Sequence, residues 1–98
     1  MHQSIIMPLA IEDINKAFAW YESKRLGLGD EFIDLVMESV ELLCSHPRIA
    51  AVRYDDTRTF VLKRFPFMIH YIIDEEREAI VVTGVYHTSM SPKKWKER

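Results

Sequence analysis

Residues 58–74 read RTFVLKRFPFMIHYIID, two runs of β-branched and aromatic residues separated by Pro66. Runs of this kind predict β-strands, and proline interrupts the hydrogen bonding of a strand. A third run, AIVVTGVYH, follows the acidic, turn-like residues 74–78. We therefore predict three strands joined as an antiparallel meander, at residues 58–65, 67–74 and 79–87. The middle run is apolar on both of its faces, which favours a central position in the sheet.

The first half of the chain has helical periodicity. Apolar side chains recur every three or four positions in residues 9–25 and again up to Ser45, which predicts two amphipathic helices. Gly27 and Gly29 permit a tight turn between them, and Asp30 is the expected N-cap of the second helix. Two helices joined by so short a turn lie antiparallel.

These elements predict an α+β fold with the order β-α-α-β-β-β. A small antiparallel sheet of three to four strands packs against an N-terminal helical hairpin, and residues 4–7 supply the fourth, short strand. The hairpin covers one face of the sheet. We expect the other face to be open, either as solvated apolar surface or as a binding surface.

Length and composition narrow the class of protein. A chain of 98 residues has room for one compact domain, so we predict a single domain over residues 1–98. The chain has 48% hydrophobic and 29% charged residues, a composition typical of globular proteins. This composition excludes a disordered chain. No apolar run approaches the roughly 20 residues that cross a bilayer, and no signal peptide is recognisable. We expect a soluble, cytoplasmic protein with no membrane partner.

Cysteine and histidine usage argues against a disulfide or a metal centre. Cys44 is the one cysteine and cannot form an internal disulfide. No Cys/His cluster has the spacing of a zinc site. We therefore expect no metal and no cofactor.

The net charge of −2 hides an asymmetry between the two halves. Residues 1–46 carry a net charge of −5, and residues 47–98 carry +3. The second half would offer a polyanion a modestly positive surface. This excess is too small to argue nucleic-acid binding from bulk electrostatics alone.

His87 is the histidine in the best position for chemistry. It ends the last predicted strand and opens a segment that contains Lys93, Lys94 and Trp95. Sites are often built where strands end, so His87 is a candidate acid, base or phosphate contact. The alternative is a histidine that orders the C-terminal loop by local hydrogen bonds. The residues leave both interpretations open.

Lys63 and Arg64 lie on opposite faces of the predicted strand 58–65 if strict alternation holds. One of the two then points toward the open face. Arg53, Arg58 and Arg64 could all reach that face, and arginine forks suit phosphate. The alternative is a solvated, charged strand edge.

Five sequence blocks together resemble a known family. They are Asp13-Ile14-x-x-Ala17, Trp20-Tyr21-Glu22, Gly27-Leu28-Gly29-x-Glu31-Phe32, Leu62-Lys63-Arg64-Phe65-Pro66-Phe67-x-Ile69-x-Tyr71 and His87-Thr88-Ser89-x-x-Pro92-x-x-Trp95. In this order they resemble the RelE/ParE superfamily of toxins from type II toxin–antitoxin systems, the plasmid-stabilisation type. The resemblance covers nearly the whole chain. The family's fold, a small antiparallel sheet flanked by a helical hairpin, agrees with the fold predicted above.

The resemblance implies a toxin that inhibits growth and is neutralised by a cognate antitoxin protein. ParE-like members block DNA gyrase and are not enzymes of RNA cleavage, whereas RelE-like members cut mRNA on the ribosome. Both use one scaffold, so the fold cannot decide between them.

Residue by residue, the resemblance implies two candidate catalytic residues. Arg64 matches the family's arginine before the Phe-Pro-aromatic turn, and His87 matches the histidine that ends the last strand. We expect the two to meet on the open face of the sheet. The further target-binding candidates are Arg53, Arg58, Lys63, Lys93, Lys94 and Trp95.

Met90 departs from the family pattern, because many relatives have an arginine at this position. Its lack of charge removes a cation that RNA cleavage would use to stabilise the phosphorane. We therefore favour a ParE-like toxin acting on DNA gyrase or on an undefined target. The alternatives are a ribosome-dependent mRNA endoribonuclease and a non-toxic family member that acts as a binding module.

Overall fold

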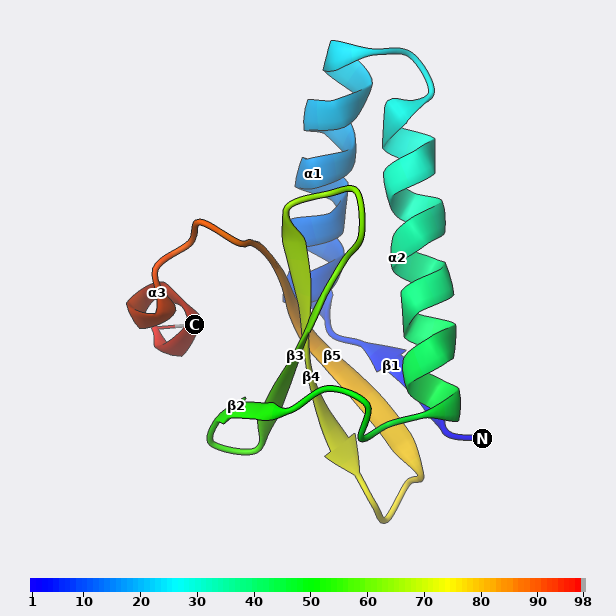
Figure 1. Ribbon diagram of the computed structural model, residues 1–98, viewed down its shortest axis with the longest axis vertical. Helices are drawn as coiled ribbons and strands as arrows, with labels where there is room; N and C mark the ends of the chain where they lie inside the picture. The colour runs from blue at the N-terminus through cyan, green and yellow to red at the C-terminus, as the bar shows by residue number, and fades with distance from the viewer. Residues whose placement is uncertain (98) are drawn as a thin grey trace.

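The computed structural model describes residues 1–97 and has two main layers, a hairpin of two long helices and a five-stranded sheet (Figure 1). A short third helix lies near the C-terminus, apart from the hairpin (Figure 1). The elements are β1 (Gln3–Ile6), α1 (Pro8–Lys24), α2 (Leu28–Ser45), β2 (Val52–Tyr54), β3 (Thr57–Val61), β4 (Phe67–Asp74), β5 (Ala79–His87) and α3 (Pro92–Lys96). This is the predicted α+β fold. The strand β2 and the short helix α3 were not predicted.

The helical hairpin forms where the sequence periodicity predicts it. Pro8 occupies the first turn of α1, where a missing N–H costs nothing because that N–H would have no helical partner. α1 and α2 lie side by side and bury one face each against the sheet (Figure 1). The buried residues of these faces are Ala10, Ile14 and Ala17 in α1 and Phe32, Val36, Val40 and Leu43 in α2. None of the helices within residues 1–97 combines the length and apolar character that a membrane span requires.

The turn between the helices is built on two glycines. Gly27 is the N-cap of α2 at φ +90°, a left-handed conformation that favours glycine. At Gly29, a Cβ atom would lie 2.8 Å from the carbonyl oxygen of Phe18, so only glycine allows the helices to approach this closely. The expectation that Asp30 caps α2 is wrong, because α2 begins two residues earlier. Asp30 lies instead in the first turn, where its charge suits the helix dipole.

The sheet has the strand order β1-β5-β4-β3-β2, and β4 is central as predicted. β4 and β5 have the predicted bounds. β1 pairs in parallel with β5, so the sheet is mixed and not antiparallel throughout. The backbone N–H of Met7 continues this pairing by donating to the carbonyl of Val82 at 3.0 Å, and α1 begins at the next residue.

β3 ends at Val61, four residues before the predicted end. Residues 62–66 form a tight loop in which the N–H of Phe65 donates to the carbonyl of Lys63 at 2.8 Å. Arg64 has φ +69°, a left-handed conformation that no strand residue adopts. The strand alternation that we expected to separate Lys63 from Arg64 therefore does not apply to them.

The face of the sheet away from the hairpin is partly covered by α3. Trp95 of α3 is 7% exposed and packs with Met68 of β4 and Tyr86 of β5, and Tyr54 and Met90 lie against this cluster. The expectation of an entirely bare second face is wrong. A helix of five residues carries no periodicity that could predict this cover.

Candidate functional site

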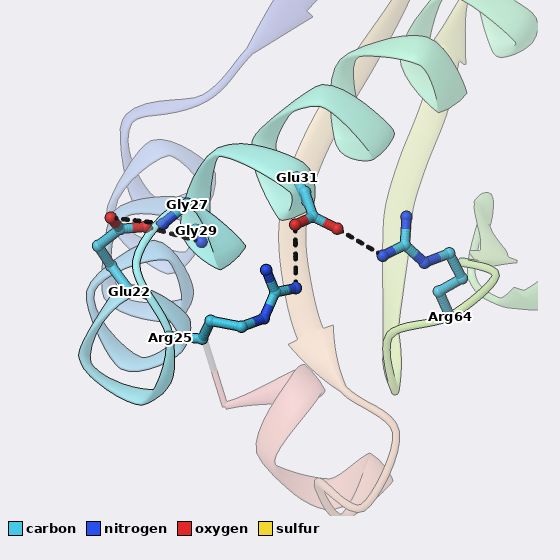
Figure 2. Close-up of polar contacts among 6 residues, drawn as sticks. All are labelled: Glu22, Arg25, Gly27, Gly29, Glu31 and Arg64. Atoms are coloured by element: carbon cyan, nitrogen blue, oxygen red, sulfur yellow. Dashed lines mark hydrogen bonds and ion pairs between the residues drawn. The ribbon is translucent and has the colours of Figure 1, made fainter.

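Arg64 lies on the hairpin side of the molecule. Its guanidinium group donates to Oε1 of Glu31 in α2 at 2.7 Å, and Arg25 donates to Oε2 of the same carboxylate at 3.0 Å (Figure 2). The Arg64 guanidinium, followed by that of Arg25, lowers the pKa of Glu31 below its ordinary value. Glu31 is therefore ionised at neutral pH and orients both arginines.

Aromatic packing holds the Arg64 loop against the hairpin. The ring of Phe65 lies 4.8 Å from that of Tyr21 and 5.3 Å from that of Phe32, both in edge-to-face geometry. The loop backbone next to Arg64 is thus fixed by a buried side chain. Arg64 itself stays exposed, with 60% of its side chain accessible to solvent.

His87 also lies on the hairpin side. It pairs directly with Phe67 across β4 and β5, so the two side chains share a face of the sheet, and their rings meet edge to face at 5.2 Å. Nδ1 of His87 accepts the backbone N–H of Ser89 at 3.0 Å and lies 2.7 Å from the Ser89 hydroxyl oxygen. Because Nδ1 accepts, the neutral ring carries its proton on Nε2.

A groove of about 630 Å³ runs beside His87, between α1 and the ends of β4 and β5. Its walls are largely apolar and include Trp20, which is 58% exposed, together with Phe67 and Met90. Lys16 is the one lysine or arginine among the described residues that line it, and the carboxylate of Asp13 accepts the backbone N–H of Val85 at 3.0 Å. This groove suits an apolar segment of another protein better than a phosphate.

Arg64 and His87 have different partners on the same side of the molecule. Within residues 1–97, no hydrogen bond or ion pair joins them; Arg64 contacts Glu31, and His87 contacts Ser89 and Phe67. The expectation that they lie on the face away from the hairpin is wrong, because both side chains are on the hairpin side.

The remaining candidate residues divide between the two sides of the sheet. The guanidinium of Arg53 lies 5.5 Å from the ring centre of Trp95, on the α3 side, and Lys93 and Lys94 are exposed on α3. Arg58 is opposite Tyr71 and donates to the carbonyl of Ala50 at 2.7 Å on the hairpin side. Lys63 is exposed in the loop after β3.

Trp95 contributes to packing as well as to the surface. Its ring meets that of the fully buried His70 edge to face at 4.7 Å and stacks on Tyr54 at 5.7 Å. Nδ1 of His70 lies 2.8 Å from the Tyr54 hydroxyl. His70 is therefore a buried core residue that is hydrogen-bonded through Nδ1.

The geometry bears on whether the site could cleave RNA. RNA cleavage by attack of the 2′-hydroxyl needs an acid, a base and cations around one phosphate. Here Arg64 is ion-paired with Glu31 and does not line the groove beside His87. Residues 1–97 also contain no group of three or more His, Cys, Asp or Glu side chains placed to hold a metal ion.

Sequence reasoning missed the residues that organise this region. Glu31 and Glu22 appear in the family blocks, but nothing in their spacing shows which distant groups they bind. Trp20 was visible as a large apolar residue beside polar neighbours in α1, and its exposure to solvent is the feature that marks it.

A family model matches most of the chain. The model described as ParE toxin of type II toxin-antitoxin system, parDE, matches residues 5–92. No curated protein matches the chain.

Solved structures of toxins share the fold at low sequence identity. The chain is similar to a chain of the intact RelBE toxin–antitoxin complex of E. coli, with a TM-score of 0.71 and 15% identity over 92% of this chain and 100% of that one. It is similar to a chain of the chromosomal ParDE system of P. aeruginosa, with a TM-score of 0.65 and 15% identity over 89% and 96%. It is also similar to a chain of the RelBE2 complex of Mycobacterium tuberculosis, with a TM-score of 0.61 and 18% identity over 88% and 90%.

Proposed function

The chain belongs to the ParE family of toxins of type II toxin–antitoxin systems, and from this premise we propose that it arrests growth by binding a protein target, DNA gyrase. The toxin acts as a binding protein and not as an endoribonuclease. A cognate antitoxin neutralises it by covering its surface.

The observation that carries this proposal is the apolar groove beside His87. An enzyme that cleaves RNA needs several cations directed at one phosphate, but Arg64 is held by Glu31 outside this groove. The exposed Trp20 and the partly buried Met90 are residue types enriched in protein–protein contacts. The site therefore supports protein recognition better than phosphate chemistry.

Similar structures support the antitoxin as a partner. Two of the similar chains come from structures described as toxin–antitoxin complexes, RelBE of E. coli and RelBE2 of M. tuberculosis. An exposed apolar surface on a growth-inhibiting protein also requires a partner that covers it. Co-purification of the chain with a small protein encoded next to it tests this part.

The test of the target is to induce the chain alone in cells and to follow plasmid supercoiling and mRNA integrity in the same culture. Gyrase inhibition predicts that plasmids relax while mRNA stays intact. Removing a general acid or base typically costs a hundredfold or more in rate. Cleavage of mRNA that His87→Ala and Arg64→Ala both abolish would therefore replace this proposal with an endoribonuclease. Unaffected growth would indicate a non-toxic binding module.

A further inference from the structure

We propose that the tip of the helical hairpin, centred on Leu26, is the surface with which the toxin docks on its protein target. The target presents an apolar pocket with an acidic rim. This inference rests on the proposed function, because it assigns the contact surface of a toxin that acts by binding.

Leu26 is the most conspicuous apolar side chain on the surface. It is 88% exposed, more than any other large hydrophobic residue of the described chain except Met1. It lies between α1 and α2, at the end of the hairpin that extends beyond the sheet (Figure 1). A convex tip cannot enclose a peptide segment, so its complement is a pocket in a folded partner.

Three hydrogen bonds brace the turn that carries Leu26. The carboxylate of Glu22 accepts the N–H of Gly27 through Oε2 and that of Gly29 through Oε1, both at 2.9 Å (Figure 2). The N–H of Leu28 donates to the carbonyl of Arg25 at 3.0 Å and closes the turn. A preorganised apolar anchor binds with little loss of conformational entropy, which separates Leu26 from an ordinary exposed leucine.

Cationic side chains lie in the same region of the molecule as this anchor. Arg25 precedes Leu26, and Glu31 orients Arg25 and Arg64 while leaving their side chains 58% and 60% exposed. Each guanidinium uses one nitrogen on Glu31, so its remaining N–H groups are available to a partner. Nζ of Lys24 lies 4.0 Å from the ring centre of Trp20 and adds a third positive charge.

The carboxylates of the tip are mostly occupied. Both oxygens of Glu22 accept backbone N–H groups, and both oxygens of Glu31 accept arginine N–H groups. Asp30 remains as the exposed carboxylate in the first turn of α2. The hydrogen-bond donors left over at the tip therefore include those of the arginines, and arginine forks fit the carboxylates of an acidic rim.

The experiment compares Leu26→Ser with the control Val61→Ser, which removes an apolar side chain that is 57% exposed at the end of β3. Both variants are expressed from a titratable promoter, and the induction that halves growth is measured. We expect Leu26→Ser to need at least tenfold more toxin, as for an interface hot spot, and Val61→Ser to stay within about twofold. Arg25→Glu should weaken the toxin in the same direction, because it repels an acidic rim.

Thermal unfolding shows whether each variant is folded, and co-purification shows whether the folded variant still binds the antitoxin. Full growth inhibition by folded Leu26→Ser overturns the inference whatever the target is. Loss of antitoxin binding together with toxicity also overturns it, because the tip would then bind the antitoxin. Two further outcomes bear on the proposed function. Growth arrest without plasmid relaxation contradicts gyrase as the target, but the comparison of Leu26→Ser with Val61→Ser still tests the docking surface.

A wild-type chain that does not arrest growth rejects the proposed function and this inference together.

Discussion

Glu31 shows at the scale of one residue how a single carboxylate joins distant parts of this fold. It lies in the first turn of α2, yet it binds Arg25 at the end of α1 and Arg64 in the loop between β3 and β4. The arginines can be held only while the carboxylate is ionised. The junction is therefore sensitive to pH.

The two arginines lower the pKa of Glu31 in the folded chain, so the unfolded chain binds a proton to it more readily. The resulting stabilisation is fully present above the ordinary pKa of about 4.5 and is lost as pH falls through the lowered value. We expect the difference in unfolding free energy between wild type and Glu31→Gln to stay constant from pH 7 to about 4.5 and to shrink as pH falls further. Urea denaturation at each pH measures it. A difference that stays constant below about pH 4.5 as well would contradict the role of the charge.

Gly29 carries a second prediction at this scale. An added Cβ would come within 2.8 Å of the Phe18 backbone oxygen, and backbone cannot move aside as a flexible side chain can. We expect Gly29→Ala to destabilise the protein by about 1–3 kcal/mol, the usual cost of overpacking. Glu38→Ala, at an exposed position of the same helix, should stay within about 0.5 kcal/mol. Equal stability of the two variants would show that α1 and α2 can separate at no cost.

At the scale of the element, α3 is the part that depends most on tertiary contacts. Five residues are too few for a stable isolated helix. The Ser91 hydroxyl accepts the N–H of Lys93 at 3.3 Å at its first turn, and Trp95 inserts into the cluster on the second face of the sheet. α3 is thus held by one buried side chain.

Trp95→Ala should remove this anchor and lower the free energy of unfolding by about 3 kcal/mol. This is the lower end of the range observed when a buried aromatic residue is replaced by alanine. The lower end applies because the indole N–H has no hydrogen-bond partner within residues 1–97, so its loss carries no broken bond. Lys94→Ala on the same short helix is the control and should change stability by less than about 0.5 kcal/mol. Chemical denaturation compares them, and equal midpoints would contradict the docking of α3 through Trp95.

The sequence predicts best the elements that are long enough for their alternation of buried and exposed residues to repeat several times. The two helices, β4 and β5 extend over eight or more residues, so their burial patterns are readable. β2, with three residues, carries no such pattern, and the four residues of β1 do not indicate a parallel partner. The early end of β3 follows from the left-handed Arg64, which no propensity predicts.

The candidate site was predictable as a set of residues but not as an arrangement. The sequence singled out Arg64 and His87, and the structure places both on the hairpin side with different partners. Those partners, Glu31 and Phe67, lie on separate elements, so their contacts depend on the packing of hairpin and sheet. Local spacing carries no information about that packing.

At the scale of the whole molecule, the chain combines a rigid hairpin tip, an apolar groove and arginines that are already paired. Each feature suits contact with another protein, and none directs several cations at one phosphate. Within residues 1–97, the cations of the second half are divided between the two sides of the sheet. This arrangement supports the proposal that the toxin stops growth by occupying a target.

The most direct test of this claim is the supercoiling activity of purified DNA gyrase in the presence of the purified chain, with and without its cognate antitoxin. We expect that supercoiling stops at micromolar toxin and returns when an equimolar amount of antitoxin is added. Undiminished supercoiling at that concentration, together with antitoxin-sensitive cleavage of mRNA on ribosomes by the same preparation, would contradict it.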